Sequence, residues 1–117
     1  MIFGIGTDLC SVERVVQSLE RTSGLTERLF HPNERELKPE SLAARFAAKE
    51  ALAKAIGDPR QLSWNEICIV KDQSGKPHFE FSGETAHRLA ALGDLRFHLS
   101  LSHDAQLAQA MVVVESK

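Results

Sequence analysis

The sequence predicts an α+β fold in which an antiparallel sheet packs on one long central helix. Three observations support this: apolar or alternating segments at both ends of the chain, an alanine-rich helical stretch in the middle, and short turn sequences between the later strands. The expected order is strand, helices, hairpin, helix, hairpin. No linker or change of composition divides the 117 residues, so we expect a single domain over residues 1–117.

The first strand is expected from Ile2 to Asp8, and its two glycines share a face with Asp8. Glycine in a strand allows another backbone or a ligand to approach closely. Ser11 is a suitable N-cap for a helix that runs to about Ser23 and stops at Gly24.

A short helical turn is expected over Thr26 to Phe30, before a break at the following His-Pro pair. Asn33 with Glu36 three residues later is typical of a capping box. The strongest helix prediction covers Glu40 to Ile56, which contains seven alanines and ends at Gly57.

The second half of the chain predicts two hairpins separated by a helix. A turn-rich stretch from Asp72 to Pro77 favours the first hairpin, and His103 to Gln106 joins the strands of the second. The helix is capped by Ser82 and closed by Gly93. The expected elements are strands over Trp64–Val70 and His78–Phe81, a helix over Gly83–Leu92, and strands over Phe97–Ser102 and Leu107–Val114.

Bulk composition excludes several functions. The net charge of −2 gives no overall positive field for nucleic acid, and no apolar run approaches the ~20 residues of a membrane span. Cys10 and Cys68 form no C-x-x-C motif, which argues against a thiolate metal site and favours a reducing cytoplasm.

The central helix has no ordinary solvated face when it is drawn as a wheel. Bulky apolar residues gather on one side, from which Arg45 and Lys49 also project. Alanines fill the other side, which carries Glu50 and Lys54. Asp8 and Glu50 would place two carboxylates on two rigid elements, as Mg²⁺ requires when phosphates complete its coordination.

Simpler interpretations of these charges remain open. Glu50 and Lys54 have the spacing of an i,i+4 surface ion pair, which stabilises a helix by about 0.2–0.5 kcal/mol. Their setting among alanines favours a functional site instead, because buried charges are costly unless they are paired or bound to a metal. Lys49 is also compatible with a surface position, in which its aliphatic chain lies along the protein and its ammonium group reaches water.

A second polar group lies towards the end of the chain. His98, Ser100 and Ser102 share one strand face, which ends beside His103 and Asp104 at a turn. A turn histidine is often merely exposed. Likewise, Gly75-Lys76-Pro77 taken alone is compatible with an ordinary hairpin turn.

Together these segments resemble the holo-[acyl-carrier-protein] synthase family, the small 4′-phosphopantetheinyl transferases. The matching segments occur in the family's order and span most of the chain: Gly4-Ile5-Gly6-Thr7-Asp8-Leu9, Arg45-Phe46-Ala47-Ala48-Lys49-Glu50-Ala51, Lys54-Ala55, Gly75-Lys76-Pro77 and Ser100-Leu101-Ser102-His103-Asp104. The resemblance implies a 4′-phosphopantetheinyl transferase-like fold. It also implies transfer of the phosphopantetheine arm of coenzyme A to a serine of an acyl carrier protein, with release of 3′,5′-ADP.

The resemblance also implies roles for individual residues. Asp8 and Glu50 would hold Mg²⁺, and Lys54 would stabilise or protonate the leaving phosphate. The base would be Glu50 or a Mg²⁺-bound water. The residues expected to contact coenzyme A are Arg45, Lys49, Lys54, Gly75, Lys76, Pro77, Ser102 and His103.

An acidic carrier protein is the expected partner, and the family resemblance implies a homotrimer with sites between subunits. Arg14 and Arg21 lie seven residues apart, near one face of the first helix, and are the candidates for docking the carrier protein. The alternative is that both are merely solvated charges near Glu13 and Glu20. Two other functions stay open: a non-catalytic coenzyme A or nucleotide-binding module, and a structural interaction domain.

Overall fold

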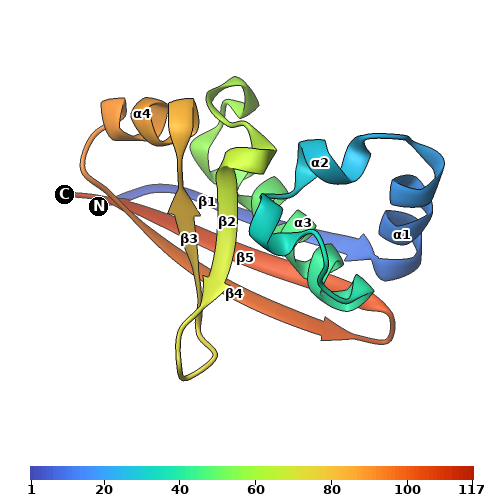
Figure 1. Cartoon of the computed structure of the whole chain (residues 1–117). Coiled ribbons are helices and arrows are strands. Elements are labelled where there is room, and N and C mark those ends of the chain that lie inside the picture. The colour runs from blue at the N-terminus through green and yellow to red at the C-terminus, as the bar shows by residue number, and fades with distance from the viewer.

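The computed structural model describes all residues of the chain, 1–117. Figure 1 shows the long helix α3 lying across a sheet formed by the two ends of the chain. The helices are α1 (Val12–Arg21), α2 (Leu25–Leu29), α3 (Pro39–Ile56) and α4 (Gly83–Ala91). The strands are β1 (Ile2–Ser11), β2 (Ile67–Lys71), β3 (Pro77–Phe81), β4 (Leu95–Asp104) and β5 (Leu107–Ser116).

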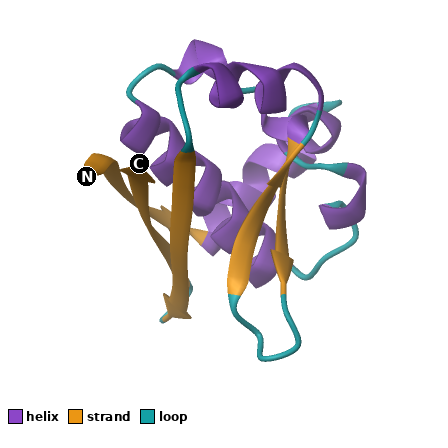
Figure 2. Ribbon diagram, turned by 90° about the vertical axis from the view of Figure 1, so that its left-hand side faces the viewer, coloured by secondary structure: helices purple, strands orange, loops and turns teal.

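The strands form two antiparallel sheets, so the predicted α+β class with antiparallel pairing is confirmed. The larger sheet has the order β1-β5-β4, which places β5 in the middle and leaves β1 and β4 at opposite edges. The smaller sheet is the β2–β3 hairpin. Figure 2 shows these two groups of strands with helices around them.

Glycines in β1 explain why α3 packs so closely on the larger sheet. A Cβ atom added to Gly4 would lie 1.8 Å from the Ala55 carbonyl oxygen, and one added to Gly6 would lie 1.9 Å from that of Ala51. No real Cβ comes within 3.0 Å of such an atom. The predicted close approach is therefore an approach of the α3 backbone to β1.

Small side chains complete this interface. The alanines of α3 face inward and have no exposed surface at Ala47, Ala48 and Ala51. On β5, Ala108 and Ala110 are equally buried. Because little side-chain volume separates the helix from the sheet, the two backbones lie close together. Polar side chains of β1 and α3 can therefore reach each other.

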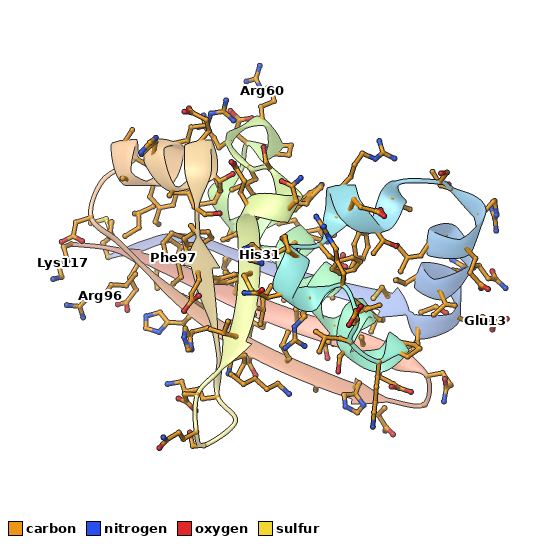
Figure 3. The ribbon with its side chains drawn as sticks, viewed as in Figure 1. Glu13, His31, Arg60, Arg96, Phe97 and Lys117 are labelled. Carbon is orange, nitrogen blue, oxygen red and sulfur yellow. The ribbon has the colours of Figure 1, made fainter.

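Side chains, rather than backbone hydrogen bonds, join the smaller sheet to the larger one. Phe97 on β4 packs edge-on against Phe81 and Phe79 on β3, with ring centroids 4.9 and 6.3 Å apart. Figure 3 shows Phe97 beside the strands of the hairpin. This aromatic cluster fixes the position of the hairpin, which carries Lys71 and the Gly75-Lys76-Pro77 turn.

Two predicted boundaries were wrong in detail. α1 ends with Thr22 as its C-cap, and Gly24, at a φ of +81°, precedes α2 instead of closing α1. The capping box uses His31 and Glu34 around the short 3₁₀ helix Pro32–Glu34, not Asn33 and Glu36.

Other boundaries differ less. Residues 64–66 form a 3₁₀ turn before β2, and Ser82 caps α4 without a side-chain hydrogen bond. No helix has the length and apolar character needed to cross a lipid bilayer.

Candidate active site

The first part of the site lies where the middle of β1 passes α3. Gly6 brings the two backbones together, so Asp8, two residues further along the same face, meets side chains of α3. The Lys54 ammonium donates to the Thr7 carbonyl oxygen at 2.8 Å and to Asp8 Oδ1 at 3.3 Å. Lys54 therefore pairs with Asp8, and the alternative of an ion pair between Glu50 and Lys54 is not formed.

Glu50 lines a cleft of about 320 Å³ beside this pair. We call it the carboxylate cleft; its lining residues are Glu50, Ala53, Lys54, Gly57, Pro59 and Trp64. Burial raises the pKa of Glu50, the negative charge of Asp8 raises it further, and Lys54 partly offsets both effects. The two carboxylates therefore lie close enough to repel each other.

This carboxylate pair fits the predicted Mg²⁺. A divalent cation removes the repulsion that raises the pKa of Glu50, and its hard oxygen preference matches both side chains. No group of three or more His, Cys, Asp or Glu side chains gathers at any one place. The protein would thus supply two carboxylates and leave the remaining positions to phosphate oxygens and water, which is common for Mg²⁺.

The second part of the site is a cleft of about 310 Å³ between the N-terminal half of α3, the end of β4 and the end of β2. We call it the cationic cleft; its lining residues are Glu40, Ser41, Ala44, Arg45, Lys71, Leu101, Ser102 and His103. Three of the predicted coenzyme-contacting residues, Arg45, Ser102 and His103, come together here. The alternation on β4 is confirmed: Leu99 is buried, whereas His98 and Ser100 are exposed.

Lys49 is the clear exception among the predicted coenzyme contacts. Its side chain is 1% exposed, and its ammonium group donates to Glu34 Oε1 at 2.6 Å and to the carbonyl oxygens of Leu29 at 2.8 Å and Trp64 at 3.0 Å. An ammonium has three hydrogens, and all three are used. Assigning Lys49 to coenzyme phosphates was therefore wrong, as was the alternative that it extends to the surface.

The Gly75-Lys76-Pro77 segment lies in the β2–β3 turn, outside both clefts. Asp72 Oδ1 organises this turn by accepting from the backbone N–H groups of Ser74 and Lys76, both at 2.9 Å. Gly75 has a φ of +85°, which glycine adopts without strain. The turn is therefore well ordered by its own hydrogen bonds, with Lys76 exposed.

The two clefts share no residue, and the site residues on the larger sheet lie on its two opposite edge strands. Asp8 belongs to the edge strand β1, whereas Ser102 and His103 belong to the edge strand β4, with β5 between them. Arg45 and Glu50 are five residues apart on α3, and at about 100° per residue they point in different directions. One copy of the chain therefore does not bring all of the predicted site residues into one cleft.

The predicted docking arginines lie on α1, next to a third cleft. Ser11 Oγ accepts from the Arg14 backbone N–H at 3.3 Å, which confirms Ser11 as the N-cap. No carboxylate lies within ion-pairing distance of Arg14 or Arg21. Arg14 borders a mostly apolar cleft of about 440 Å³, lined further by Leu9, Cys10, Ser11, Val15, Ser18, Leu19, Leu25, Leu29 and Phe46.

Sequence reasoning missed Lys71, Trp64 and Glu34. Lys71 is the last residue of β2 and lines the cationic cleft. In the sequence it stands next to exposed turn residues, and its positive charge near the Gly75-Lys76-Pro77 segment was the available indication of a binding role. Glu34 is 1% exposed despite its charge. A proline at the first position of a helical turn with a glutamate at the third was the available sign of its capping role.

Comparison with known proteins identifies the family. The model of the 4′-phosphopantetheinyl transferase superfamily matches residues 4–110. Holo-[acyl-carrier-protein] synthase from Clavibacter michiganensis is 55% identical over 115 residues, which cover 98% of this chain and 97% of that protein. The same enzyme from Salinispora arenicola is 50% identical and covers 98% and 99% of the two chains. The chain belongs to the holo-[acyl-carrier-protein] synthase family.

Solved structures of the holo-[acyl-carrier-protein] synthase family have the same fold. The enzyme from Neisseria meningitidis superimposes with a TM-score of 0.90 at 36% identity, over 99% of this chain and 100% of that one. The Bacillus anthracis enzyme, solved in complex with CoA (3′,5′-ADP), has a TM-score of 0.81 at 35% identity, over 100% and 99% of the two chains. The fold prediction made from the family resemblance is therefore confirmed.

Proposed function

We propose that residues 1–117 act as a single domain that transfers the 4′-phosphopantetheine arm of coenzyme A to a serine hydroxyl of an acyl carrier protein. The reaction would depend on Mg²⁺ and release 3′,5′-ADP. The observation that carries the proposal is the meeting of Asp8, Glu50 and Lys54 at the crossing of β1 and α3 in a chain of this family.

The carboxylate cleft would hold the pyrophosphate of coenzyme A. When bound to Asp8 and Glu50, Mg²⁺ would neutralise charge that develops on the phosphates. Lys54, which donates to Asp8 Oδ1 at 3.3 Å, would donate to the leaving phosphate. Glu50 is our candidate for accepting the serine proton, because it is the one carboxylate among the residues that line this cleft. Phosphoryl-type transfer relies mainly on such positioning and charge stabilisation.

The cationic cleft would hold the nucleotide end of coenzyme A. Arg45, Ser102 and His103 supply hydrogen-bond donors, and we add Lys71 to this group because it lines the same cleft. The exposed Lys76 and the backbone of Gly75 and Pro77 would reach the nucleotide from the hairpin.

The separation of the clefts supports a homotrimer with sites between subunits. If the β1 edge of one copy lies beside the β4 edge of the next, the carboxylate cleft of one faces the cationic cleft of the other. Such a contact joins two different surfaces, and it closes into a ring when the rotation between copies is suitable. The outer face of the larger sheet offers exposed apolar side chains for burial, namely Phe3, Ile5, Leu9 and Met111.

The carrier protein would dock on α1. Arg14 and Arg21 lack acidic partners within the chain, so both remain available to an acidic partner. The apolar cleft beside Arg14 would accept apolar side chains of the same partner. A cytoplasmic location agrees with the two cysteines, both of which are free thiols.

Intact-mass spectrometry tests the reaction. An apo-acyl carrier protein incubated with this protein, coenzyme A and Mg²⁺ should gain the mass of one phosphopantetheine arm, and it should gain nothing when Mg²⁺ is chelated. Coenzyme A binding without any mass gain on several carrier proteins would favour the non-catalytic binding module instead.

Subunit complementation tests the shared site. Glu50→Gln disables the carboxylate cleft and Arg45→Ala disables the cationic cleft, so each variant alone should be nearly inactive. After unfolding and refolding together, mixed trimers would contain some sites with both intact clefts, and activity should return. No recovery from correctly refolded mixtures would count against sites between subunits.

A further inference from the structure

Three charged side chains are buried together between α3, the Pro32–Glu34 turn and β2. They are Glu34 and Lys49, each 1% exposed, and Arg45, 8% exposed. One carboxylate thus faces two cations, and the buried group carries one excess positive charge. Buried charges are costly unless they are paired, so this excess requires an explanation.

Glu34 is the centre of the group. Its Oε1 accepts from the Lys49 ammonium at 2.6 Å and from the His31 backbone N–H at 3.0 Å, while its Oε2 accepts from the Ile69 backbone N–H at 2.9 Å. It therefore connects α3 to β2 and to its own turn. The Arg45 Nε lies 3.7 Å from the same Oε2, within ion-pairing distance but beyond a hydrogen bond.

Lys49 and Arg45 differ in how well they are satisfied. All three hydrogens of Lys49 have acceptors. Arg45 has one long hydrogen bond, from Nη1 to the Ser41 carbonyl oxygen at 3.5 Å, and its buried Nε has no partner. Lys49 is thus committed to the fold, whereas Arg45 keeps donors available where it lines the cationic cleft.

The surroundings of Arg45 indicate an anionic ligand. Lys71 and His103 line the same cleft, and the one carboxylate among its lining residues is the exposed Glu40. An incoming phosphate would pair with the excess positive charge of the buried group and provide acceptors for the free donors of Arg45.

We propose that Glu34 is a positioning residue for coenzyme A binding: its buried carboxylate, 3.7 Å from the Arg45 Nε, attracts the guanidinium and keeps it beside the cationic cleft. This assignment rests on the proposed function, because it takes a coenzyme phosphate as the ligand of Arg45. Glu34 itself is buried and does not contact the ligand.

Glu34→Gln alone is an ambiguous test, because it leaves the Lys49 ammonium buried without its counter-ion and would destabilise the fold. The double variant Glu34→Gln/Lys49→Met removes both charges of the pair and should regain most of the melting temperature. If Glu34 acts only as the counter-ion of Lys49, this variant should bind coenzyme A as the wild type does. If Glu34 positions Arg45, affinity should stay reduced by roughly tenfold.

The measurements are calorimetric titration with coenzyme A and steady-state kinetics. We expect the double variant to show a raised KM for coenzyme A, with kcat and the KM for carrier protein little changed. Lys49→Met, which keeps Glu34, is the matched control and should retain coenzyme A affinity. Arg45→Ala should weaken binding more in the wild type than in the double variant, because only the wild type has the Glu34 carboxylate that keeps Arg45 beside the cleft.

A second variant covers the case in which no Glu34 variant folds. Arg45→Lys keeps the charge but loses the rigid planar fork, so it should bind coenzyme A much more weakly than the wild type does. Wild-type affinity in Arg45→Lys, or in the double variant, would overturn the assignment and leave the proposed function intact. If the wild-type protein does not bind coenzyme A, the proposed function fails and the assignment fails with it.

Discussion

Replacing Gly6 by alanine tests the close approach of α3 to β1, on which the whole carboxylate cleft depends. The new Cβ would lie 1.9 Å from the Ala51 carbonyl oxygen, and this distance would have to grow to at least 3.0 Å. The colliding atom belongs to the helix backbone, so no side-chain rotation relieves the clash. The helix must move away from the strand along a tightly packed alanine face.

Overpacking of this kind costs about 1–3 kcal/mol, and we expect the upper end because rigid backbone must move. For a chain of this size, a loss of about 3 kcal/mol lowers the melting temperature by roughly 10 °C. Transferase activity should fall further than stability does, because Glu50 adjoins Ala51 and would move away from Asp8.

Chemical denaturation followed by circular dichroism measures the loss, with Thr7→Ala as the matched control. Thr7 lies in the same strand but its side chain faces away from α3, so truncating it should change the unfolding free energy far less. Because the clash is with backbone, Ala51→Gly should not rescue Gly6→Ala. A Gly6→Ala protein within about 0.5 kcal/mol of the wild type would refute the packing described here.

Four further outcomes are expected. Glu50→Gln should abolish Mg²⁺-dependent transfer yet unfold at the same or a higher temperature, because the raised pKa of Glu50 means that its charge opposes folding; parallel losses of activity and stability would contradict the metal assignment. Arg14→Glu should raise the KM for carrier protein more than the KM for coenzyme A in steady-state assays, and the reverse pattern would exclude α1 as the docking surface. Gln106→Gly should raise the unfolding free energy by about 0.5 kcal/mol, because Gln106 has a φ of +64°, which glycine adopts with less strain. A lower unfolding free energy in chemical denaturation would show that contacts of the Gln106 side chain outweigh this strain. Glu66 accepts hydrogen bonds from Thr85 that lower the pKa of its carboxyl group. The ionised carboxylate therefore stabilises the folded protein above the ordinary glutamate pKa, and this stabilisation is lost as the pH falls through the lowered pKa. Glu66→Gln should flatten this part of the curve of unfolding free energy against pH.

Strong local signals made much of the fold predictable from the sequence. The alanine run with Gly57 at its end predicted α3, and Gly57 indeed caps it with a φ of +85°. The glycines of β1 predicted a close approach, but not that the approaching group would be the backbone of α3. Gly24 led to a wrong prediction of the end of α1. Glycine with a positive φ more often follows a helix, but here it precedes α2.

The candidate site was predictable where a residue's role follows from its own element. Asp8 on β1 and Glu50 on α3 lie close enough to interact, as expected, although β1 continues to Ser11 and does not end at Asp8. The burial of Lys49 was not predictable, because it depends on Glu34, fifteen residues away in a turn whose cap was assigned to other residues. Tertiary pairing of this kind leaves no periodic pattern in the sequence.

The pairing of β1 with β5 has a consequence for how the protein is made. β1 has β5 as its one strand partner, and the ladder joins Ile2 to Glu115 and Ser11 to Leu107. During synthesis the first strand emerges with its backbone unpaired and its apolar residues exposed until β5 has left the ribosome. Contacts of such large sequence separation form slowly, so folding should be slower than that of a helical protein of equal length. A nascent chain stalled before β5 has emerged should remain sensitive to protease throughout.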